Sequence, residues 1–432
     1  MMRVLWFTST SYLYELQKHQ YHGCGWVESL QTGLVQHDEI NLAVSFFHTN
    51  DKDKKVKDNT TYYPLYRKRL RKNPLKAIFN NFTGALESER ETVHKMLKVI
   101  EDFNPDIINV FGSEDIFSSI QQYTKIPVVI HIQGVINPII DSYFPPGVSK
   151  WDFLFEFKQF LSLLTGTNQF FRIKRISKQG TRELNNLKNT RYVFGRTDWD
   201  YCCMTLLAPK AKYFHINEML REDFYDVSIK KNKKNNTQIL NLVTTLSSTI
   251  YKGLDVILKT ALLLSKTSNI KICWRLIGVD DNDKLIAFFE QKFKVNHKDL
   301  GIKCMGVMEP KKFIPVIKES DLYVHTSYIE NSPNSICEAQ IIGTPVIATN
   351  AGGVSSIVEH NKTGVLIPLN GVFELSHIIS NYNSNLSFYQ ELASSAKEKS
   401  IFRHDRKLIV QKCIESYCSI IDENSLNSIK RA

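Results

Sequence analysis

The chain has 432 residues, of which 43% are hydrophobic and 23% are charged. This length corresponds to two or three domains of the usual size, and the composition excludes a disordered chain, a collagen-like fibre and a small disulfide-rich protein. Lysine and arginine number 55 against 44 aspartate and glutamate residues, which gives a formal net charge of +11. Such an excess indicates an anionic partner, whether nucleic acid, a membrane surface or a phosphorylated ligand.

The start of the chain and its cysteines favour the cytoplasm. The apolar run near the start covers only residues 4–7, whereas the core of a signal peptide needs ~7–15 residues. No uncharged stretch approaches the ~18 residues of a membrane span. None of the eight cysteines forms a C-x-x-C pair. We therefore expect reduced thiols in a cytoplasmic protein, without a zinc site or a disulfide framework.

Short β-branched runs alternate with longer helical patterns in the first half of the chain. The runs predict strands over residues 4–8, 40–47, 107–111, 128–132 and 192–195. Apolar residues at helical spacing predict helices over residues 26–35 and 93–103. This alternation predicts an α/β domain with a doubly wound parallel sheet.

The pattern breaks near residues 228–237, which are polar and charged and predict an exposed loop. Beyond the loop the alternation restarts with a predicted helix over residues 254–264. The strands predicted there cover residues 240–244, 270–277, 302–305, 322–325, 345–348 and 365–367. Two facing α/β domains follow, and the cleft between them is the expected position of a ligand site.

Two segments stand outside this alternation. Residues 144–180 are rich in aromatic residues and end in basic ones, which predicts either a helical pair packed on the first domain or an amphipathic surface that touches lipid. Residues 52–76 hold ten basic and two acidic residues. This basic segment is either a solvated loop or a contact for the inner face of the plasma membrane, where each basic residue contributes ~1 kcal/mol.

The most informative stretch begins with Glu330 and Glu338, which are eight positions apart and separated by a polar turn. The turn carries residues that cap helices, and the apolar pattern after it predicts a helix that ends at Gly343. A helix N-terminus has unpaired N–H groups and about half a positive charge, which suits a phosphate. The amides of Ser335 and Ile336 are therefore candidate phosphate ligands, and the glutamates are better suited to hydroxyl groups.

Further motifs surround these glutamates. Gly343-Thr344-Pro345-Val346 follows them, and then Gly352-Gly353 with Glu359. The whole run resembles the second domain of retaining glycosyltransferases of family GT4, which have the GT-B fold of two facing Rossmann-like domains. The E-x7-E element of that family maps onto Glu330 and Glu338. Upstream, Tyr251-Lys252-Gly253 resembles the family element whose lysine contacts the donor diphosphate.

One feature departs from the family pattern. GT4 proteins usually have an arginine shortly before this lysine, but residues 244–249 contain none. Arg196, which follows a predicted strand of the first domain, is the candidate replacement. The missing arginine also favours the alternative of a catalytically silent scaffold that binds sugar nucleotides.

The resemblance implies a nucleoside-diphosphate sugar as the donor and no metal, because lysine, arginine and a helix N-terminus take over the role of a metal. The implied donor-binding residues are Gly23, Gly25, Lys252, Gly278, Val307, Glu330, Asn334, Ser335, Ile336 and Glu338. The implied catalytic residues are Glu330, Lys252, His131 and Arg196. Glu330 would hold sugar hydroxyls and Glu338 the ribose. The sequence leaves open whether His131 or Gln133 lines the acceptor side of the cleft.

The implied activity is the retaining transfer of a hexose-type sugar to a glycan or lipid-linked saccharide in cell-surface polysaccharide synthesis. We expect residues 1–216 to bind the acceptor, residues 217–410 to bind the sugar nucleotide, and residues 411–432 to form a helix that packs back toward the first domain. Partners other than the two substrates are the inner membrane surface, through residues 52–76 and 144–180. Nucleic acid is not expected, because no known binding motif accompanies the basic segment.

Overall fold

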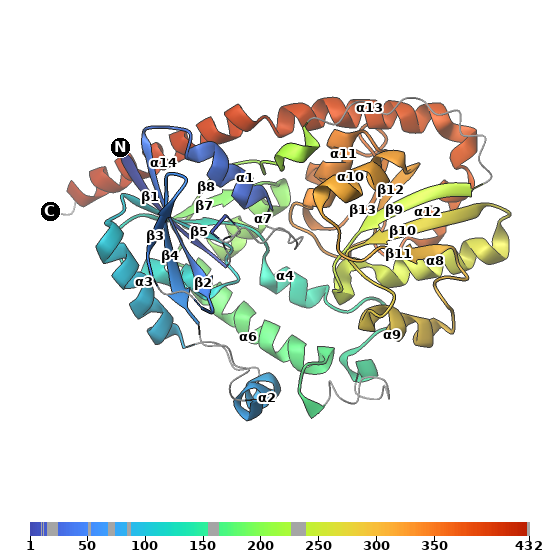
Figure 1. Cartoon of the computed structure of the whole chain (residues 1–432), viewed down its shortest axis with the longest axis horizontal. Helices are drawn as coiled ribbons and strands as arrows, with labels where there is room; N and C mark the ends of the chain where they lie inside the picture. Colours follow the sequence, from blue (N-terminus) through green and yellow to red (C-terminus); the bar gives the residue numbers. More distant parts are fainter. Residues whose placement is uncertain are drawn as a thin grey trace.

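The computed structural model describes residues 1–9, 11, 13–14, 25–50, 53–67, 74–83, 88–153, 164–225 and 239–429. Within them lie two separate sheets, each flanked by helices (Figure 1). The strand order is β3-β4-β2-β1-β5-β6-β7-β8 in the first sheet and β11-β10-β9-β12-β13-β14 in the second. All neighbouring strands run parallel except β3 and β4, which are antiparallel. The predicted pair of doubly wound α/β domains is confirmed.

The strands and helices occupy the following residues. The first sheet consists of β1 (Met2–Thr8), β2 (Ile40–His48), β3 (Lys55–Lys57), β4 (Thr60–Tyr66), β5 (Ile107–Phe111), β6 (Val128–His131), β7 (Tyr192–Gly195) and β8 (Lys212–His215). The second consists of β9 (Ile239–Thr245), β10 (Lys271–Ile277), β11 (Ile302–Cys304), β12 (Leu322–His325), β13 (Val346–Thr349) and β14 (Val365–Ile367). The helices before β9 are α1 (Gly25–Leu34), α2 (Pro74–Thr83), α3 (Glu89–Phe103), η2 (Ile116–Gln122), α4 (Ile136–Asp141), η3 (Lys150–Phe153), α6 (Gln169–Leu187), α7 (Asp198–Leu207) and η5 (Glu222–Phe224). Those after β9 are η6 (Ile250–Lys252), α8 (Leu254–Thr267), α9 (Lys284–Phe293), α10 (Pro310–Glu319), α11 (Asn334–Ile342), η7 (Gly352–Ser356), α12 (Val372–Ser380), η8 (Tyr382–Asn385), α13 (Leu386–Arg403) and α14 (Arg406–Ile429).

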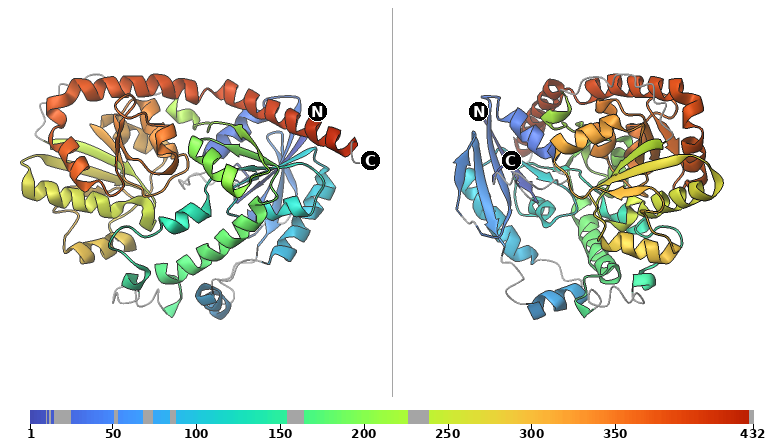
Figure 2. Two further views of the ribbon diagram at one scale, coloured as in Figure 1. Left: turned by 180° about the vertical axis from the view of Figure 1, so that it is seen from behind. Right: turned by 45° about the vertical axis from the view of Figure 1, so that its right-hand side comes forward.

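The first sheet is built around β1, whose residues Val4, Leu5, Trp6 and Phe7 are fully buried. A strand covered on both faces reads as a continuous apolar run, which is why this segment was predictable. One face packs on α1 and α14, where the Tyr417 hydroxyl accepts a hydrogen bond from Trp6 Nε1 at 3.2 Å. The helices α13 and α14 run along both domains and end beside the first sheet (Figure 2). Among the described residues, no helix combines the length and the apolar run that a bilayer crossing requires.

The basic segment corrects an expectation. Residues 55–57 and 60–66 are strands at the edge of the first sheet rather than a solvated loop, and Tyr62 is fully buried. Lysines on the short edge strand β3 prevent pairing with another chain. Lys54, just before β3, forms an ion pair with Asp102 at 2.6 Å. Most other basic residues of the segment lie outside the described residues: Lys52, Lys68, Arg69, Arg71 and Lys72.

The aromatic segment 144–180 contacts both domains: α6 packs on α2 and α4 of the first domain, as predicted, whereas the part near Phe153 packs on the second. Phe153 is 1% exposed and stacks on Phe288 of α9, with ring centroids 4.3 Å apart. Lys292 of α9 donates to Asp152 at 2.8 Å. Burial of this kind leaves Phe153 unable to contact lipid. Phe155, Phe157 and Phe160, which were part of the predicted lipid surface, lie outside the described residues.

This packing gives a test of how the domains are held together. Phe153→Ala should lower the free energy of unfolding by about 3–5 kcal/mol, because it leaves a cavity against Phe288. Trp151→Ala is the matched control, since Trp151 is 53% exposed and its loss should cost less than about 1 kcal/mol. Urea denaturation followed by circular dichroism measures both values. Equal losses in the two variants would contradict the observed packing.

Candidate functional site

Each sheet contains one point where the strand order reverses, between β1 and β5 in the first domain and between β9 and β12 in the second. Ligands of doubly wound sheets bind outside the carboxyl ends of the strands at such points. In the second domain, Lys252 follows β9 and Glu330 follows β12. The two residues singled out by motif therefore lie where the topology predicts a ligand.

Lys252 and Glu330 form an ion pair with Nζ 2.6 Å from Oε1. Ser327 Oγ donates to the same oxygen at 2.7 Å, and His325 Nε2 lies 3.1 Å from it. In the described part of the chain, no hydrogen bond reaches the second oxygen, Oε2, although the side chain is 12% exposed. Oε1 of Glu330 is thus surrounded by donors, whereas Oε2 can accept a hydrogen bond from a ligand.

The electrostatics of this pair keep both groups charged. Burial alone would raise the pKa of Glu330, but Lys252 and His325 hold it well below its usual value. Burial would likewise lower the pKa of Lys252, and the facing Glu330 carboxylate outweighs that effect and raises it. The site therefore presents an ammonium group and a carboxylate side by side at neutral pH.

The turn that carries Lys252 is fixed by Gly253. This glycine has a φ of 76°, and a Cβ atom added to it would lie 1.9 Å from the carbonyl oxygen of Thr326. Thr326 Oγ1 donates back to the carbonyl of Gly253 at 3.0 Å. Only glycine permits such a close approach in this backbone conformation. A glycine after Lys252 is thus required for this turn to pack against the end of β12.

Glu338 lies in α11 and is 3% exposed. Arg221 Nη2 donates to its Oε1 at 2.6 Å, whereas its buried Oε2 has no hydrogen-bond partner among the described residues. Burial raises the pKa of Glu338 despite the neighbouring guanidinium of Arg221. Arg221 was not predicted as a site residue, because it follows the connector between the domains and is not part of a recognisable motif. Its side chain also lies beside Gly25, where an added Cβ would be 2.7 Å from Arg221 Cδ.

The N-terminus of α11 differs in part from the prediction. The amide of Ile336 donates to the carbonyl of Pro333 at 3.0 Å, so it is not an unpaired N–H group. Asn334 and Ser335 are half-buried at the start of the helix. The amide of Ile336 is thus engaged within the turn, and the phosphate-binding role of the Ser335 amide stays a prediction.

The predicted glycine loops occupy different places. Gly23 lies outside the described residues, and Gly25 is the first residue of α1. In the second domain the amide of Gly278 donates to the carbonyl of Gly306 at 2.8 Å, which joins the loops after β10 and β11. Val307, next to Gly306, is 61% exposed. Gly278 and Val307 therefore lie on adjacent loops of the second domain.

His131 does not line a cleft, which corrects the prediction for it. Its ring is fully buried among the rings of Trp26, Phe111 and Phe194, with centroid distances of 4.9, 5.0 and 5.4 Å. Neither ring nitrogen has a hydrogen-bond partner among the described residues. Burial, and then the nearby Arg196, lower the pKa of His131 well below its usual value. Gln133, two residues further along, is half-buried beyond the end of β6.

Arg196 lies on the first-domain side of the site. Its guanidinium is 4.6 Å from the ring centroid of Trp26, and its Nη2 donates to the carbonyl of Gln133 at 3.3 Å. Its buried Nε has no hydrogen-bond partner in the described residues. The structure thus groups Arg196 with Gln133 rather than with the Lys252–Glu330 pair.

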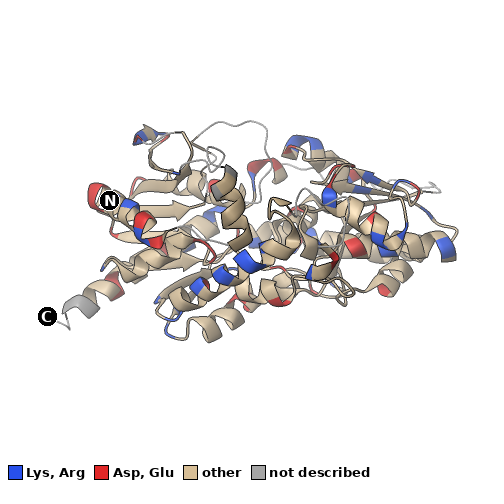
Figure 3. Ribbon diagram, turned by 90° about the horizontal axis from the view of Figure 1, so that it is seen from below, with Lys and Arg blue, Asp and Glu red and all other residues tan. Residues whose placement is uncertain are grey.

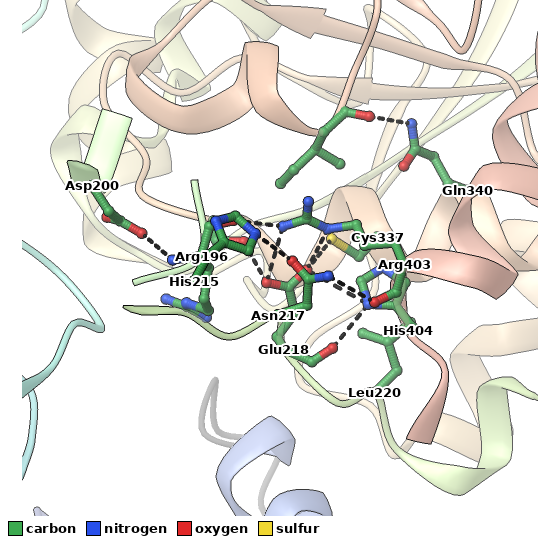
Figure 4. A network of polar contacts seen from close by, with 12 residues as sticks. Arg196, Asp200, His215, Asn217, Glu218, Leu220, Cys337, Gln340, Arg403 and His404 are labelled. Atoms are coloured by element: carbon green, nitrogen blue, oxygen red, sulfur yellow. Dashed lines mark hydrogen bonds and ion pairs between the residues drawn. The ribbon is translucent and has the colours of Figure 1, made fainter. Parts of the chain in front are cut away.

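A network around the fully buried Glu218 ties the site to the rest of the molecule (Figure 4). Arg403 Nε donates to Oε1 of Glu218 at 3.1 Å, and Ser332 Oγ donates to Oε2 at 2.7 Å. His404 Nδ1 lies 2.9 Å from the carbonyl oxygen of Glu218. Arg403 Nη2 also donates to the carbonyl of Arg196 at 2.9 Å. The connector, the turn before α11, the α13–α14 junction and the first domain therefore meet at one carboxylate.

Within the part of the chain that the structure describes, two groups of side chains have the composition of a metal site. Glu218, Cys337 and His404 form one, and Asp281, His297 and Cys304 form the other. In the first, the Arg403 guanidinium beside Glu218 already neutralises the carboxylate and would repel a cation. In the second, Asp281 pairs with Lys298 at 2.7 Å. Neither group includes Lys252, Glu330 or Glu338.

The buried imidazole of His131 predicts acid sensitivity. Its folded pKa lies below the ~6.5 of an unfolded histidine, so its stabilising effect is complete above about pH 6.5 and is lost as the pH falls. His131→Phe should reduce the loss of unfolding free energy between pH 7 and pH 5 by up to about 2 kcal/mol. His37→Asn, at an exposed histidine, should leave that loss unchanged. Denaturant titrations at the two pH values measure the difference, and identical pH dependence of His131→Phe and wild type would refute the prediction.

Part of the chain matches a known protein family. Residues 226–399 match the family model of group 1 glycosyl transferases. An uncharacterized glycosyltransferase of Methanocaldococcus jannaschii is 26% identical over 149 residues, which are 34% of this chain and 37% of that protein. The chain therefore matches little more than a third of that relative's length.

Solved structures match along nearly the whole chain. Sucrose-phosphate synthase from Thermosynechococcus elongatus superposes with a TM-score of 0.70 at 14% identity, covering 98% of this chain and 100% of that one. Anabaena HepE in complex with UDP and glucose gives 0.64 at 15% identity, covering 97% and 100%. The two parallel-sheet Rossmann-like domains thus have the arrangement of GT-B glycosyltransferases.

Proposed function

Because residues 226–399 match the family model of group 1 glycosyl transferases and the chain has the GT-B fold, we propose that it transfers a sugar from a nucleoside diphosphate with retention of configuration. The observation that carries the proposal is the Lys252–Glu330 pair at the point where the strand order of the second sheet reverses. A mobile ammonium group at this point suits a diphosphate. The carboxylate beside it suits hydroxyl groups.

The donor would be held chiefly by carboxylate oxygens that accept no hydrogen bond from the described residues. Oε2 of Glu330 would accept from sugar hydroxyls, and the buried, unpartnered Oε2 of Glu338 would accept from the ribose. A buried acceptor without a partner costs free energy until a ligand donor meets it. Ser335 and Gly25 would lie near the diphosphate, with Arg221 as the cation that replaces the missing family arginine. Arg196 would instead act toward the acceptor, beside Gln133.

The proposed reaction takes place on one face of the donor sugar. The bond between the anomeric carbon and the diphosphate oxygen breaks, the acceptor hydroxyl oxygen bonds to the same carbon from the same side, and its proton passes to the departing diphosphate. No side-chain nucleophile is needed. Lys252 would stabilise the charge that develops on the leaving oxygen, the kind of contribution that often dominates catalysis.

The finer assignments are part of the proposal. A hexose-type donor is supported by the UDP and glucose in the structure of Anabaena HepE. We assign acceptor binding to residues 1–216, sugar-nucleotide binding to residues 217–410 and a return helix to residues 411–432. The acceptor would be a glycan or a lipid-linked saccharide of cell-surface polysaccharide synthesis, reached at the inner face of the membrane, and no metal would be required.

Removal of the lysine tests the assignment. Lys252→Ala should lower the kcat of sugar release or transfer about 100–1000-fold, as loss of one charge-stabilising group typically does. The substrates are a panel of UDP- and GDP-sugars, with the products identified by mass spectrometry. Lys259→Ala is the control, because Lys259 lies in the next helix and pairs with Asp255 at 2.8 Å. Near-normal turnover by Lys252→Ala would contradict the proposal.

The same panel separates an enzyme from a scaffold. A scaffold would bind a nucleotide sugar and release no sugar from any donor, with or without added saccharides. An enzyme should turn over at least one donor, and chelation of divalent ions with EDTA should leave its rate unchanged.

A further inference from the structure

A cavity of about 190 Å³ lies at the carboxyl edge of the first sheet. Ser9 follows β1, Phe111 ends β5 and Arg67 follows β4, and all three line the cavity. The strand order of this sheet reverses between β1 and β5. The cavity therefore occupies the ligand position of the first domain, as Lys252 and Glu330 do in the second.

Cations dominate the walls of this cavity. Arg67, Arg175 and Arg182 all line it. Arg175 and Arg182 are seven residues apart in α6, so they lie on one face of that helix. Lysine and arginine recur along α6 in the view from below (Figure 3). Asp115, which also lines the cavity, caps η2 and accepts from the amide of Ile116 at 2.6 Å.

Glu114, the other acid in the lining, does not oppose an anion. Its Oε2 is buried and has no hydrogen-bond partner within the described residues. Burial raises the pKa of Glu114 to about 8; Glu183 and Asp115 add to the rise, while its own backbone amide and Arg196 oppose it. Below that pH the carboxyl group is neutral and carries a proton that it can donate. An unmatched buried polar atom at the wall of a cavity indicates a ligand group that meets it.

Helix α6, which carries two of the arginines, is linked to the turn of the donor site through Tyr143. The Tyr143 hydroxyl donates to Oε1 of Gln169 in α6 at 2.5 Å, and its ring centroid lies 5.9 Å from that of Tyr251. Tyr251 immediately precedes Lys252 in the turn after β9. The arginines of α6 and the turn that carries Lys252 are therefore joined by a short chain of side-chain contacts.

From this arrangement we infer that the acceptor is a saccharide carrying a phosphate group, which Arg67, Arg175 and Arg182 bind. The inference rests on the proposed function, because it names the substrate class of the acceptor side of the same cleft. Arginine matches phosphate oxygens with two parallel hydrogen bonds. A cavity of about 190 Å³ is smaller than the ~300 Å³ at which ordinary ligand pockets begin, so it holds the charged end of the acceptor rather than all of it.

Binding of small probes to the full chain tests this inference. With UDP present, glucose 6-phosphate and inorganic phosphate should bind and compete with each other, and glucose should bind at least tenfold more weakly. Arg175→Gln should weaken the binding of glucose 6-phosphate about tenfold or more and leave the affinity for UDP unchanged. Lys178→Gln is the control on the same helix, because its Nζ donates to the carbonyl of Thr83 at 2.8 Å and does not line the cavity.

Three results would overturn the inference. They are equal affinity for glucose and glucose 6-phosphate, equal losses in Arg175→Gln and Lys178→Gln, and an effect of Arg175→Gln confined to sedimentation with phosphatidylglycerol vesicles. The last would assign the arginines to a membrane surface. Arg175 is exposed, so its replacement should leave the fold intact, as circular dichroism can verify. UDP affinity is measured separately. If the wild type does not bind UDP, the proposed function is contradicted. If it binds UDP but does not prefer glucose 6-phosphate to glucose, only this inference is contradicted.

Discussion

The buried carboxylate of Glu218 is the constraint on which the candidate site depends. It lies in the connector between the domains and is bound by Arg403, Ser332 and Cys337 at 3.1, 2.7 and 3.2 Å. Burial would raise its pKa, yet Arg403 and the other nearby cations hold that pKa well below its usual value. A buried charge that loses its partner typically costs about 3–5 kcal/mol. This cost fixes the turn before α11, and with it the positions of Glu330 and Glu338.

A second set of contacts holds the first domain against the same turn. Asn331 Nδ2 donates to Asp200 Oδ1 at 2.6 Å, and the amide of Asp198 donates to Ser356 Oγ at 3.0 Å. Elsewhere, Phe153 packs against Phe288 of α9. Lys252 and Glu330 are thus held between two contact regions rather than at the end of one domain. A site held in this way needs little reorganisation when charge develops on a leaving group.

Sequence patterns were sufficient where local rules decide the outcome. The central strands were predictable because strands buried on both faces are continuous apolar runs in the sequence. The tight turn that carries Lys252 was predictable from the glycine that follows it. The strand β4 was not predicted, because the many charged residues of segment 52–76 favour an exposed loop. The segment nevertheless contains a buried strand with Tyr62. His131 was misplaced because period-two geometry gives the face of a strand but not what covers that face. Arg221 and Glu218 were missed because their partners lie more than a hundred residues away.

We expect a sugar nucleotide to bind between the Lys252 turn and the start of α11. Hydrogen–deuterium exchange of the full chain, with and without saturating UDP, tests it most directly because it locates the ligand without requiring turnover. We expect UDP to slow amide exchange in residues 250–256 and 330–338, on both sides of the Lys252–Glu330 pair. Saturable UDP binding that protects neither segment, or protects only residues of α6, would contradict it.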